Sequence, residues 1–439
     1  KSKINQNFFL HFLFKDVFLS HKFIFVKMRV LIVGNGGRES AIADKLMADS
    51  RPVELYFANG NATTEKLGKN LNLSGIKEIK EFALKEEIEL TIIGPEAPLV
   101  DGIVESFQEA GLKIFGAKSR AAKLEGSKSF AKKFMQTHGV KTATAKVFDS
   151  YNEALDYLNG KNFPLVIKAS GLAGGKGVVI CDSKETAQAT LHSFMIDRIY
   201  GDSGIQVVIE DYLIGFEASI IAFSNGKKLF PCIAVKDYKK VGNGDKGLNT
   251  GGMGSVAPSP EFTPEHFQDF EKNILTPTLN GLNQEHLGFT GFIFFGLMVT
   301  KDGTYLLEYN MRLGDPETQS LLPLLNNELL DVIEDCLEGK DIKLSFKDEK
   351  AVCLVMCSGG YPGTIQTGIE ITGIEKVKHS KILFAGAQYS GDRLLTSGGR
   401  VVNLVATGNT YEEAREKVYK DAIPLNFDYA FYREDIAQF

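Results

Sequence analysis

The stretch that decides the fold is EYNMRLGDPETQ, Glu308–Gln319, which follows two apolar runs joined by a short turn. Glu308 and Asn310 stand two residues apart at the end of a predicted strand, so both side chains leave the same face. A carboxylate and an amide oxygen suit Mg²⁺, a hard cation that keeps water ligands and often shares its shell with phosphates. More charge follows directly in Arg312 and Asp315. The stretch therefore predicts a metal and phosphate site at a strand end.

A glycine-rich loop follows another apolar strand upstream, in FPLVIKASGLAGGKGVVI, residues 163–180. Lys168 ends the strand, and the loop from Gly171 to Gly177 leads into the next strand. A glycine loop between two strands is a hairpin flap, unlike a P-loop, which opens a helix. Its backbone N–H groups approach phosphate oxygens without obstruction, and Lys168 and Lys176 add compact positive charge. The pattern favours a phosphate clamp, with an ordinary solvated lysine as the alternative.

The N-terminal part alternates short apolar strands with helical segments. Strands are expected at 29–33, 53–58 and 89–93. This alternation predicts a parallel sheet. The loop Gly34-Asn35-Gly36-Gly37 follows the first of these strands, and Gly94-Pro95-Glu96 follows the third. Open α/β sheets bind their ligands at such strand ends.

Acidic and glycine-rich segments mark the rest of the chain. Glu210 ends another apolar strand, where a backbone edge and a carboxylate suit an adenine and ribose hydroxyls, the alternative being an ordinary acidic strand end. Asn225-Gly226 between two apolar runs predicts a hairpin. Further elements are expected as a polar glycine-rich loop at 237–255, paired strands at 292–300 and 304–309, and a tail of strands and turns from about 351.

Composition limits the classes of protein that the chain can represent. Its 439 residues carry 50 basic and 55 acidic side chains and are 44% hydrophobic, which excludes disorder, collagen, coiled coil and a dominant nucleic-acid footprint. At about 150 residues per domain, the length predicts roughly three domains. The five cysteines form no C-x-x-C pair and lack zinc-site spacing, which favours reduced thiols in the cytoplasm.

Residues 1–27 differ from the rest of the chain. They hold seven of the 31 phenylalanines and five lysines against one aspartate. Charged residues break the apolar runs, which are too short to span a bilayer. We expect this segment to be a translated leader or the product of an upstream start, with a targeting extension or an interfacial anchor as alternatives. No catalytic role is expected for it.

Six motifs, taken together, resemble the phosphoribosylamine–glycine ligase family of the ATP-grasp superfamily. They are GNGGRE (34–39), IKASGLAGGKGV (167–178), NTGGMG (249–254), EYNMRLGDPETQ (308–319), CSGGYPG (357–363) and TSGGRV (396–401). The resemblance runs from Met28 to the C-terminus. It implies an α/β and α+β multidomain chain, in which an ATP-grasp fold is flanked by a Rossmann-like parallel-sheet domain and a small β-rich domain. The implied units are 28–128, 129–213 with the flap, 214–345 with the metal site, and 346–439.

The resemblance also implies the reaction. ATP phosphorylates the carboxylate of glycine, and the amine of 5-phosphoribosylamine attacks the resulting glycyl phosphate to give glycinamide ribonucleotide, ADP and phosphate. Mg²⁺ or Mn²⁺ is the implied metal. We expect a cytoplasmic monomer whose partners are these small molecules, without nucleic acid or membrane.

Site residues follow from the same resemblance, each with a structural ion pair or hydrogen bond as its alternative. The expected nucleotide contacts are Lys128, Lys168, Gly174, Gly175, Lys176, Gly177, Glu210, Leu213 and Glu217, and the expected metal ligands are Glu308 and Asn310. Arg312, Asp237 and Lys168 are expected in catalysis, with Arg312 stabilising the transferred phosphoryl group. The expected contacts to glycine and the sugar phosphate are Gly36, Gly37, Arg38, Glu96, Asp315, Gly399 and Arg400.

Three positions depart from the family pattern. Ser40 stands where histidine is usual, Tyr238 replaces another histidine, and Leu248 replaces a proline. These departures leave the reaction in place but put details of the ribose-phosphate pocket in doubt, Ser40 above all.

Three competing interpretations remain weaker. A dinucleotide oxidoreductase needs a third small residue in the first loop, where the chain has Glu39. A carboxylase of the biotin carboxylase type carries a metal-binding glutamate on the preceding strand, but Phe295–Met298 has no carboxylate. A non-catalytic nucleotide-binding module would be expected to have lost at least one of four residues that are all present here: Lys168, Glu308, Asn310 and Arg312.

Overall fold

The computed structural model describes residues 27–439, so the predictions for the leader segment lie outside the described residues apart from Lys27. The N-terminal region is a parallel five-stranded sheet in the order β3-β2-β1-β4-β5. Its strands are β1 (Met28–Gly34), β2 (Val53–Asn59), β3 (Gly68–Leu71), β4 (Leu90–Ile93) and β5 (Ile114–Phe115). The predicted parallel sheet is confirmed, with β3 and β5 as strands that the sequence reading did not find. Among residues 27–439, no helix is both long and apolar enough to cross a membrane.

A small antiparallel sheet carries the glycine flap. Its order is β6-β9-β7-β8. The strands are β6 (Ala145–Phe148), β7 (Leu165–Ala169), β8 (Val178–Cys181) and β9 (Val207–Asp211). Residues 170–177 join β7 to its antiparallel neighbour β8, as predicted for a hairpin flap. Side chains between Phe148 and Ile209 form a hydrophobic core of their own behind this sheet.

A second antiparallel sheet, in the order β11-β10-β16-β17, ends at the predicted metal site. The strands are β10 (Phe216–Asn225), β11 (Leu229–Pro231), β16 (Thr290–Thr300) and β17 (Gly303–Asn310). The turn at Asn225-Gly226 joins β10 to β11, as the sequence predicts. Pairing of β16 with β17 shifts register at Gly296/Leu297, which leaves Leu307 as an extra residue in β17. Such a bulge redirects the backbone groups around it.

The C-terminal sheet draws strands from two distant parts of the chain. Its order is β12-β15-β18-β22-β19. The strands are β12 (Lys236–Asp237), β15 (Gly254–Ala257), β18 (Lys350–Cys357), β19 (Lys381–Phe384) and β22 (Arg400–Gly408). The sequence predicts 214–345 as one unit, yet β15 pairs outside it with β18, Val256 opposite Val352, and β12 joins the same sheet through its pairing with β15.

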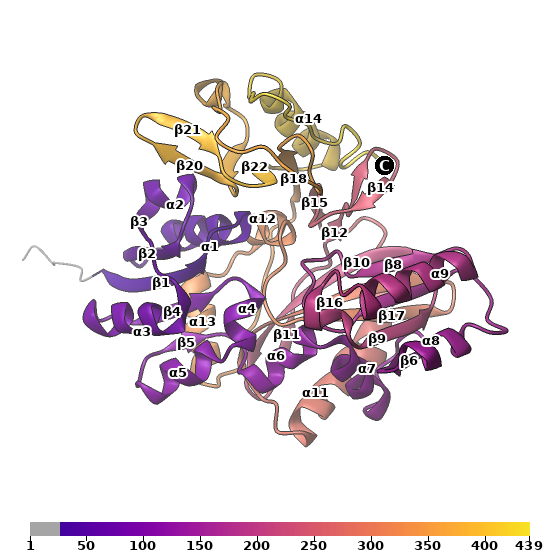
Figure 1. Cartoon of the computed structure of the whole chain (residues 1–439). Helices are drawn as coiled ribbons and strands as arrows, with labels where there is room; N and C mark the ends of the chain where they lie inside the picture. Colours follow the sequence, from indigo (N-terminus) through magenta and orange to yellow (C-terminus); the bar gives the residue numbers. More distant parts are fainter. Residues whose placement is uncertain (1–26) are drawn as a thin grey trace, which may run out of the picture.

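Helices tie the regions together (Figure 1). The helix α13 (Leu329–Leu337) follows β17 in the chain but packs against α1 (Gly37–Ala48) of the N-terminal region. A single hydrophobic cluster joins side chains of β1, β10, α13 and β18. In Figure 1 the N-terminal region lies at the left, the small sheet at the right and the C-terminal elements at the top.

Candidate active site

The predicted metal ligands lie at the end of β17. Glu308 and Asn310 are half-buried and come after the bulge at Leu307, so they keep a common face. Burial alone would raise the pKa of the Glu308 carboxyl, but Lys239, Lys128 and Lys168 hold this pKa below its ordinary value. The site offers an ionised carboxylate and an amide oxygen. Together these donors fit a hard divalent cation that completes its shell with water and phosphate oxygens.

No group of three or more histidine, cysteine, aspartate or glutamate side chains able to hold a metal occurs within residues 27–439. The donor set at the end of β17 is therefore an open one, in contrast to a closed protein cage. We call the group formed by Lys168, Glu210, Glu308, Asn310 and Arg312 the strand-end site.

Within the strand-end site, the ammonium of Lys168 has two polar partners. Its Nζ lies 2.9 Å from a carboxylate oxygen of Glu210 and donates to the Leu307 carbonyl at 3.1 Å. In the pairing of β7 with β9, Lys168 opposes Val208 and Val166 opposes Glu210, so the two charged side chains share a face. Both are buried. Burial opposes ionisation of Glu210, but Lys168 and a second lysine, Lys132, lower the pKa of its carboxyl.

Arg312 connects the strand-end site to the N-terminal region. Its Nη2 lies 2.9 Å from Glu125 Oε1 and its Nε lies 3.4 Å from Glu96 Oε2. Nη2 also donates to Asn310 Oδ1 at 3.3 Å. Glu125 is held in turn by the Met311 backbone N–H, at 2.7 Å. Burial opposes the charge of Arg312, yet Glu125 and Glu96 raise the pKa of its guanidinium, which stays ionised.

The flap begins next to a helix start. The Lys128 backbone N–H, the first in α7 (Lys128–Thr137), donates to the Ser170 carbonyl at 2.7 Å. Gly174 and Gly175 have φ of +56° and +76°, a left-handed conformation that glycine adopts without steric cost. Lys176 is exposed at the tip of the loop. The flap thus offers exposed backbone and one free lysine, whereas Leu213 is half-buried just beyond β9.

Several carboxylates lie close together where the second antiparallel sheet meets the C-terminal sheet. Asp237 on β12 has a buried Oδ1 without a hydrogen-bond partner among the described residues. Burial and the nearby Glu317 raise the pKa of Asp237 well above its ordinary value. Burial also raises the pKa of Glu317, whose Oε1 accepts from Ser219 at 3.3 Å. Glu217, the expected nucleotide contact, lies 2.7 Å from Lys239 in an ion pair. This junction is suited to a cationic group.

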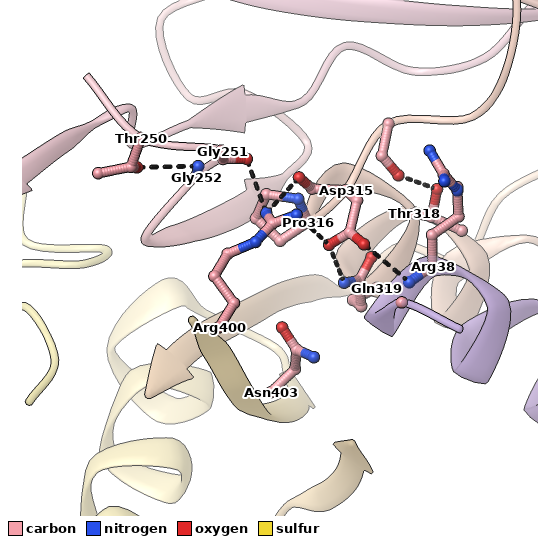
Figure 2. A network of polar contacts seen from close by, with 12 residues as sticks. Arg38, Thr250, Gly251, Gly252, Asp315, Pro316, Thr318, Gln319, Arg400 and Asn403 are labelled. Atoms are coloured by element: carbon pink, nitrogen blue, oxygen red, sulfur yellow. Dashed lines mark hydrogen bonds and ion pairs between the residues drawn. The ribbon is translucent and has the colours of Figure 1, made fainter. Parts of the chain in front are cut away.

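Asp315 lies at the centre of a network that joins the N-terminal and C-terminal regions (Figure 2). Its Oδ2 accepts from the Arg38 backbone N–H at 3.3 Å, and its Oδ1 accepts from Gln319 at 2.8 Å. Arg400 Nη2 lies 3.3 Å from the same Oδ1, and Arg400 Nη1 donates to the carbonyls of Asp315 and Gly251. Burial opposes ionisation of Asp315, but Arg400 and Arg38 lower its pKa. Both carboxylate oxygens of Asp315 are therefore engaged by protein groups.

The loop at Gly36 also holds a carboxylate. The Gly36 backbone N–H donates to Glu39 Oε2 at 2.5 Å, and Arg38 Nε lies 2.7 Å from Glu39 Oε1. A Cβ atom at Gly94 would overlap this carboxylate, which explains glycine at that position. Arg38 Nη1 donates to the Leu313 carbonyl at 3.0 Å. The predicted phosphate loop is thus occupied by an internal side chain. Near it, Gly399 packs against the ring of Tyr361, where a Cβ would collide.

The three departures from the family pattern lie away from the strand-end site. Ser40 is fully buried; its Oγ donates to the Phe384 carbonyl at 2.7 Å and accepts from Asn61 at 2.9 Å. The hydroxyl of Tyr238 accepts from the Ala437 backbone N–H at 3.0 Å, and burial raises the pKa of Tyr238 to about 12. Leu248 is exposed. Ser40 and Tyr238 therefore fasten the C-terminal region to the rest of the molecule.

Ser40→Ala is expected to lower stability without changing catalysis. The substitution removes the Ser40 donor from the buried Phe384 carbonyl and one of the acceptors of the Asn61 amide, a loss of about 1–2 kcal/mol in the free energy of unfolding. Urea unfolding measures this loss, and steady-state kinetics serve as the companion measurement. A rise in the KM for the sugar phosphate at unchanged stability would instead place Ser40 at the substrate.

Sequence reasoning missed four charged residues that the structure brings to these sites, namely Glu125, Lys132, Lys239 and Glu317. Lys132 follows Lys128 by one helical turn, and this spacing was the available signal. However, Lys132 and Lys133 are neighbours, and nothing in the sequence distinguishes the buried residue from the exposed one. Glu317 lies in the quoted motif itself, but only the fold brings it next to Asp237.

Comparison with known proteins accounts for almost the whole chain. Three family models match: "Phosphoribosylglycinamide synthetase, N domain" at 28–125, its "ATP-grasp (A) domain" at 126–318 and its "C domain" at 351–439. The phosphoribosylamine–glycine ligase of Clostridium acetobutylicum is 48% identical over 416 residues, which cover 94% of this chain and 100% of that protein. The corresponding ligase of Fusobacterium nucleatum is 46% identical over 417 residues, covering 93% and 98%.

Solved structures agree with the sequence matches. The phosphoribosylamine–glycine ligase of Thermotoga maritima has a TM-score of 0.81 and 36% identity, and the match covers 93% of this chain and 100% of that one. A biotin carboxylase domain of Hydrogenobacter thermophilus, solved with its magnesium–ADP complex, has a TM-score of 0.70 at 14% identity and so shares the fold alone. The chain therefore belongs to the phosphoribosylamine–glycine ligase family, the ATP-dependent ligases of ATP-grasp fold that make glycinamide ribonucleotide in purine biosynthesis.

Proposed function

We propose that the strand-end site carries out the reaction of the family in this chain, joining glycine to 5-phosphoribosylamine through glycyl phosphate. The observation that carries the proposal is the convergence of an ionised Glu308, Asn310 and a charged Arg312 beside Lys168 and the flap. Phosphoryl transfer needs alignment and charge neutralisation more than a covalent nucleophile. These side chains supply both.

ATP is proposed to lie between the flap and the strand-end site. The exposed backbone of Gly174–Lys176, the adjoining Gly177 and the ammonium groups of Lys128, Lys168 and Lys176 would contact its phosphates. The strand end at Glu210 and Leu213 would face the adenine, with Glu217 near the ribose. Closure of the flap would exclude water from the hydrolysis-prone acyl phosphate.

Glu308 and Asn310 are proposed to hold Mg²⁺, with Mn²⁺ as a substitute of similar ligand preference. Such an ion neutralises phosphate charge when bound. Glu308 and Asn310 would hold the ion beside the phosphates, and Arg312 lies next to Asn310 with its guanidinium oriented by Glu125 and Glu96. Arg312 would stabilise charge on the transferred phosphoryl group.

Glycine is proposed to bind with its ammonium at the Asp237–Glu317 junction. The unpartnered Asp237 oxygen and the raised pKa values of both carboxyls support this assignment, because a cation would relieve both. A glycine carboxylate oxygen then attacks the γ-phosphorus, and ADP leaves. The amine of phosphoribosylamine next attacks the acyl carbon, loses a proton and expels phosphate.

The sugar phosphate is proposed to lie towards Gly36–Arg38, Glu96 and Gly399–Arg400. The arginines offer positive charge there, although each is already bonded to a carboxylate. A phosphate would have to compete with Glu39 and Asp315 for these donors. Among the proposed ligands of phosphoribosylamine, Asp315 is best regarded as the residue that holds Arg400.

The site is complete within one copy, which supports action as a monomer. All five cysteines are free and buried, which supports a reducing compartment such as the cytoplasm. Size-exclusion chromatography with light scattering tests the first expectation, and an excess of dimer would contradict it.

The decisive test of the function is product mass spectrometry with ADP release. The assay contains ATP, Mg²⁺, glycine and phosphoribosylamine generated in place, with single-omission controls. Glycinamide ribonucleotide formed only in the complete mixture, one per ADP, is the expected result. ADP without this product would indicate another acid and amine, and no ADP at all would favour a binding module.

Asp237→Asn is expected to raise the KM for glycine about tenfold to a hundredfold, the loss typical of a charged hydrogen bond. The KM for ATP should change little. Binding of an ammonium requires ionised carboxyls, and the pKa of Asp237 is raised, so in the unaltered protein the KM for glycine should fall as the pH rises through that pKa. The Asn variant should show a weaker pH dependence. Asp392→Asn, on the exposed turn between β20 (Ala387–Ser390) and β21 (Arg393–Thr396), is the control.

A further inference from the structure

Two lysines and one glutamate form a buried cluster with surplus positive charge at the edge of the strand-end site. Lys132 is 2% exposed, Glu210 3% and Lys168 6%. Lys132 Nζ lies 3.1 Å from Glu210 Oε1, and Lys168 Nζ lies 2.9 Å from Glu210 Oε2. One carboxylate neutralises one ammonium, and buried charge is stable only when it is paired. The cluster as a whole is therefore complementary to an anion.

The two lysines differ in what holds them. Lys132 lies on α7, which packs against β9 and β17. Its Nζ donates to Thr142 Oγ1 at 2.7 Å, and that hydroxyl donates to the Leu306 carbonyl at 2.6 Å. This chain of bonds anchors Lys132 to β17 of the second antiparallel sheet.

Lys168 pairs with the other carboxylate oxygen of Glu210, next to the flap where ATP is proposed to bind. It is two residues before the flap, and its second acceptor is the Leu307 carbonyl, next to Glu308. A phosphate oxygen at the strand-end site can replace either acceptor of Lys168. Burial lowers the pKa of Lys132 to about 8. The nearby ammonium of Lys168 lowers this pKa further, whereas the Glu210 carboxylate acts in the opposite direction.

We propose that Lys132 is a positioning residue for ATP, because it keeps Glu210 paired when Lys168 turns from Glu210 to a nucleotide phosphate. This inference rests on the proposed function, in which Lys168 contacts the phosphates of ATP. Without Lys132, movement of Lys168 would leave the Glu210 carboxylate buried and unpaired. Lys168 would then stay locked on Glu210 as a neutral one-to-one pair.

Lys132→Met tests the inference, with calorimetric titration of magnesium–ATP in the absence of glycine and phosphoribosylamine. The expected result is a dissociation constant about tenfold to a hundredfold higher, as for loss of a charged hydrogen bond. The KM for ATP should rise in parallel, while kcat at saturating ATP stays within a few-fold. Lys132→Arg keeps the charge and should recover most of the affinity. Lys133→Met, the exposed neighbour on α7, is the matched control and should bind as the unaltered protein does.

A double-mutant cycle with Glu210→Gln separates positioning from a general structural effect. If Lys132 acts by holding Glu210, Lys132→Met should add little in the Glu210→Gln background. Additive losses, or an unchanged dissociation constant in Lys132→Met, would overturn the inference. Should Lys132→Met fail to fold, the same cycle is run with Lys132→Gln, which removes the charge but keeps a polar group beside Thr142. Because the titration uses magnesium–ATP alone, it remains informative if the complete assay yields no glycinamide ribonucleotide.

Discussion

Glu308→Ala should reduce ADP formation by at least about a thousandfold, the largest effect expected of any substitution in this chain. Glu308 is the one charged donor of the proposed metal pair, and three lysines hold it ionised. Without Glu308, Asn310 is the remaining ligand of the proposed pair, and the nearby ammonium groups of those three lysines would repel the metal ion. Coupled-assay measurement of ADP release at saturating glycine, over a range of Mg²⁺, gives the result.

Two controls make this prediction specific. Asp302→Ala removes an exposed carboxylate from the β16–β17 turn and should leave turnover unchanged. Glu308→Gln keeps the shape but not the charge, so it should lose nearly as much activity as the alanine variant. Normal turnover in either Glu308 variant would remove this residue from the metal site.

Arg312→Lys should lower kcat by about a hundredfold to a thousandfold with little change in the dissociation constant for ATP. Lysine keeps the charge but lacks the planar fork that contacts Glu125, Glu96 and Asn310 together. The retained charge still pairs with the buried Glu125, so the variant should fold. Single-turnover measurement of ADP formation isolates the chemical step.

The control for Arg312 is Arg393→Lys, an exposed arginine on β21 (Arg393–Thr396). A rise in the dissociation constant for ATP with unchanged kcat would reassign Arg312 to nucleotide binding. A loss of stability without kinetic change would leave it as the structural link between β17 and the N-terminal region.

Local patterns predicted those parts of the fold whose partners lie close in the chain. The strand–helix alternation after Met28, the Asn225-Gly226 turn and the flap between β7 and β8 each carry their signal within a few residues. The membership of β15 in the C-terminal sheet has no such signal. Val256 pairs with Val352, and nothing in either short apolar run specifies the other.

The candidate site was predictable to a similar extent. The period of a strand places Glu308 and Asn310 on one face, and the structure keeps them there. The pairing of β17 with β16 was predicted, but the bulge that exposes the Leu307 carbonyl to Lys168 is a register shift within that pair, and no local residue pattern marks it. Burial of Lys132 likewise depends on where β9 and Thr142 lie in space.

The sheet shared by β12, β15 and the C-terminal strands limits how the enzyme can open. A hinge between residues 214–345 and the tail would have to break the ladder between β15 and β18, so these regions must travel together. The sheet that carries the flap has its own separate core and is free of this restraint. We therefore expect the enzyme to open for nucleotide exchange by rotation of the small antiparallel sheet β6-β9-β7-β8 and its core relative to the rest of the chain. In a chain truncated before β18, β15 would lose this pairing and become an exposed edge strand, which is prone to aggregation.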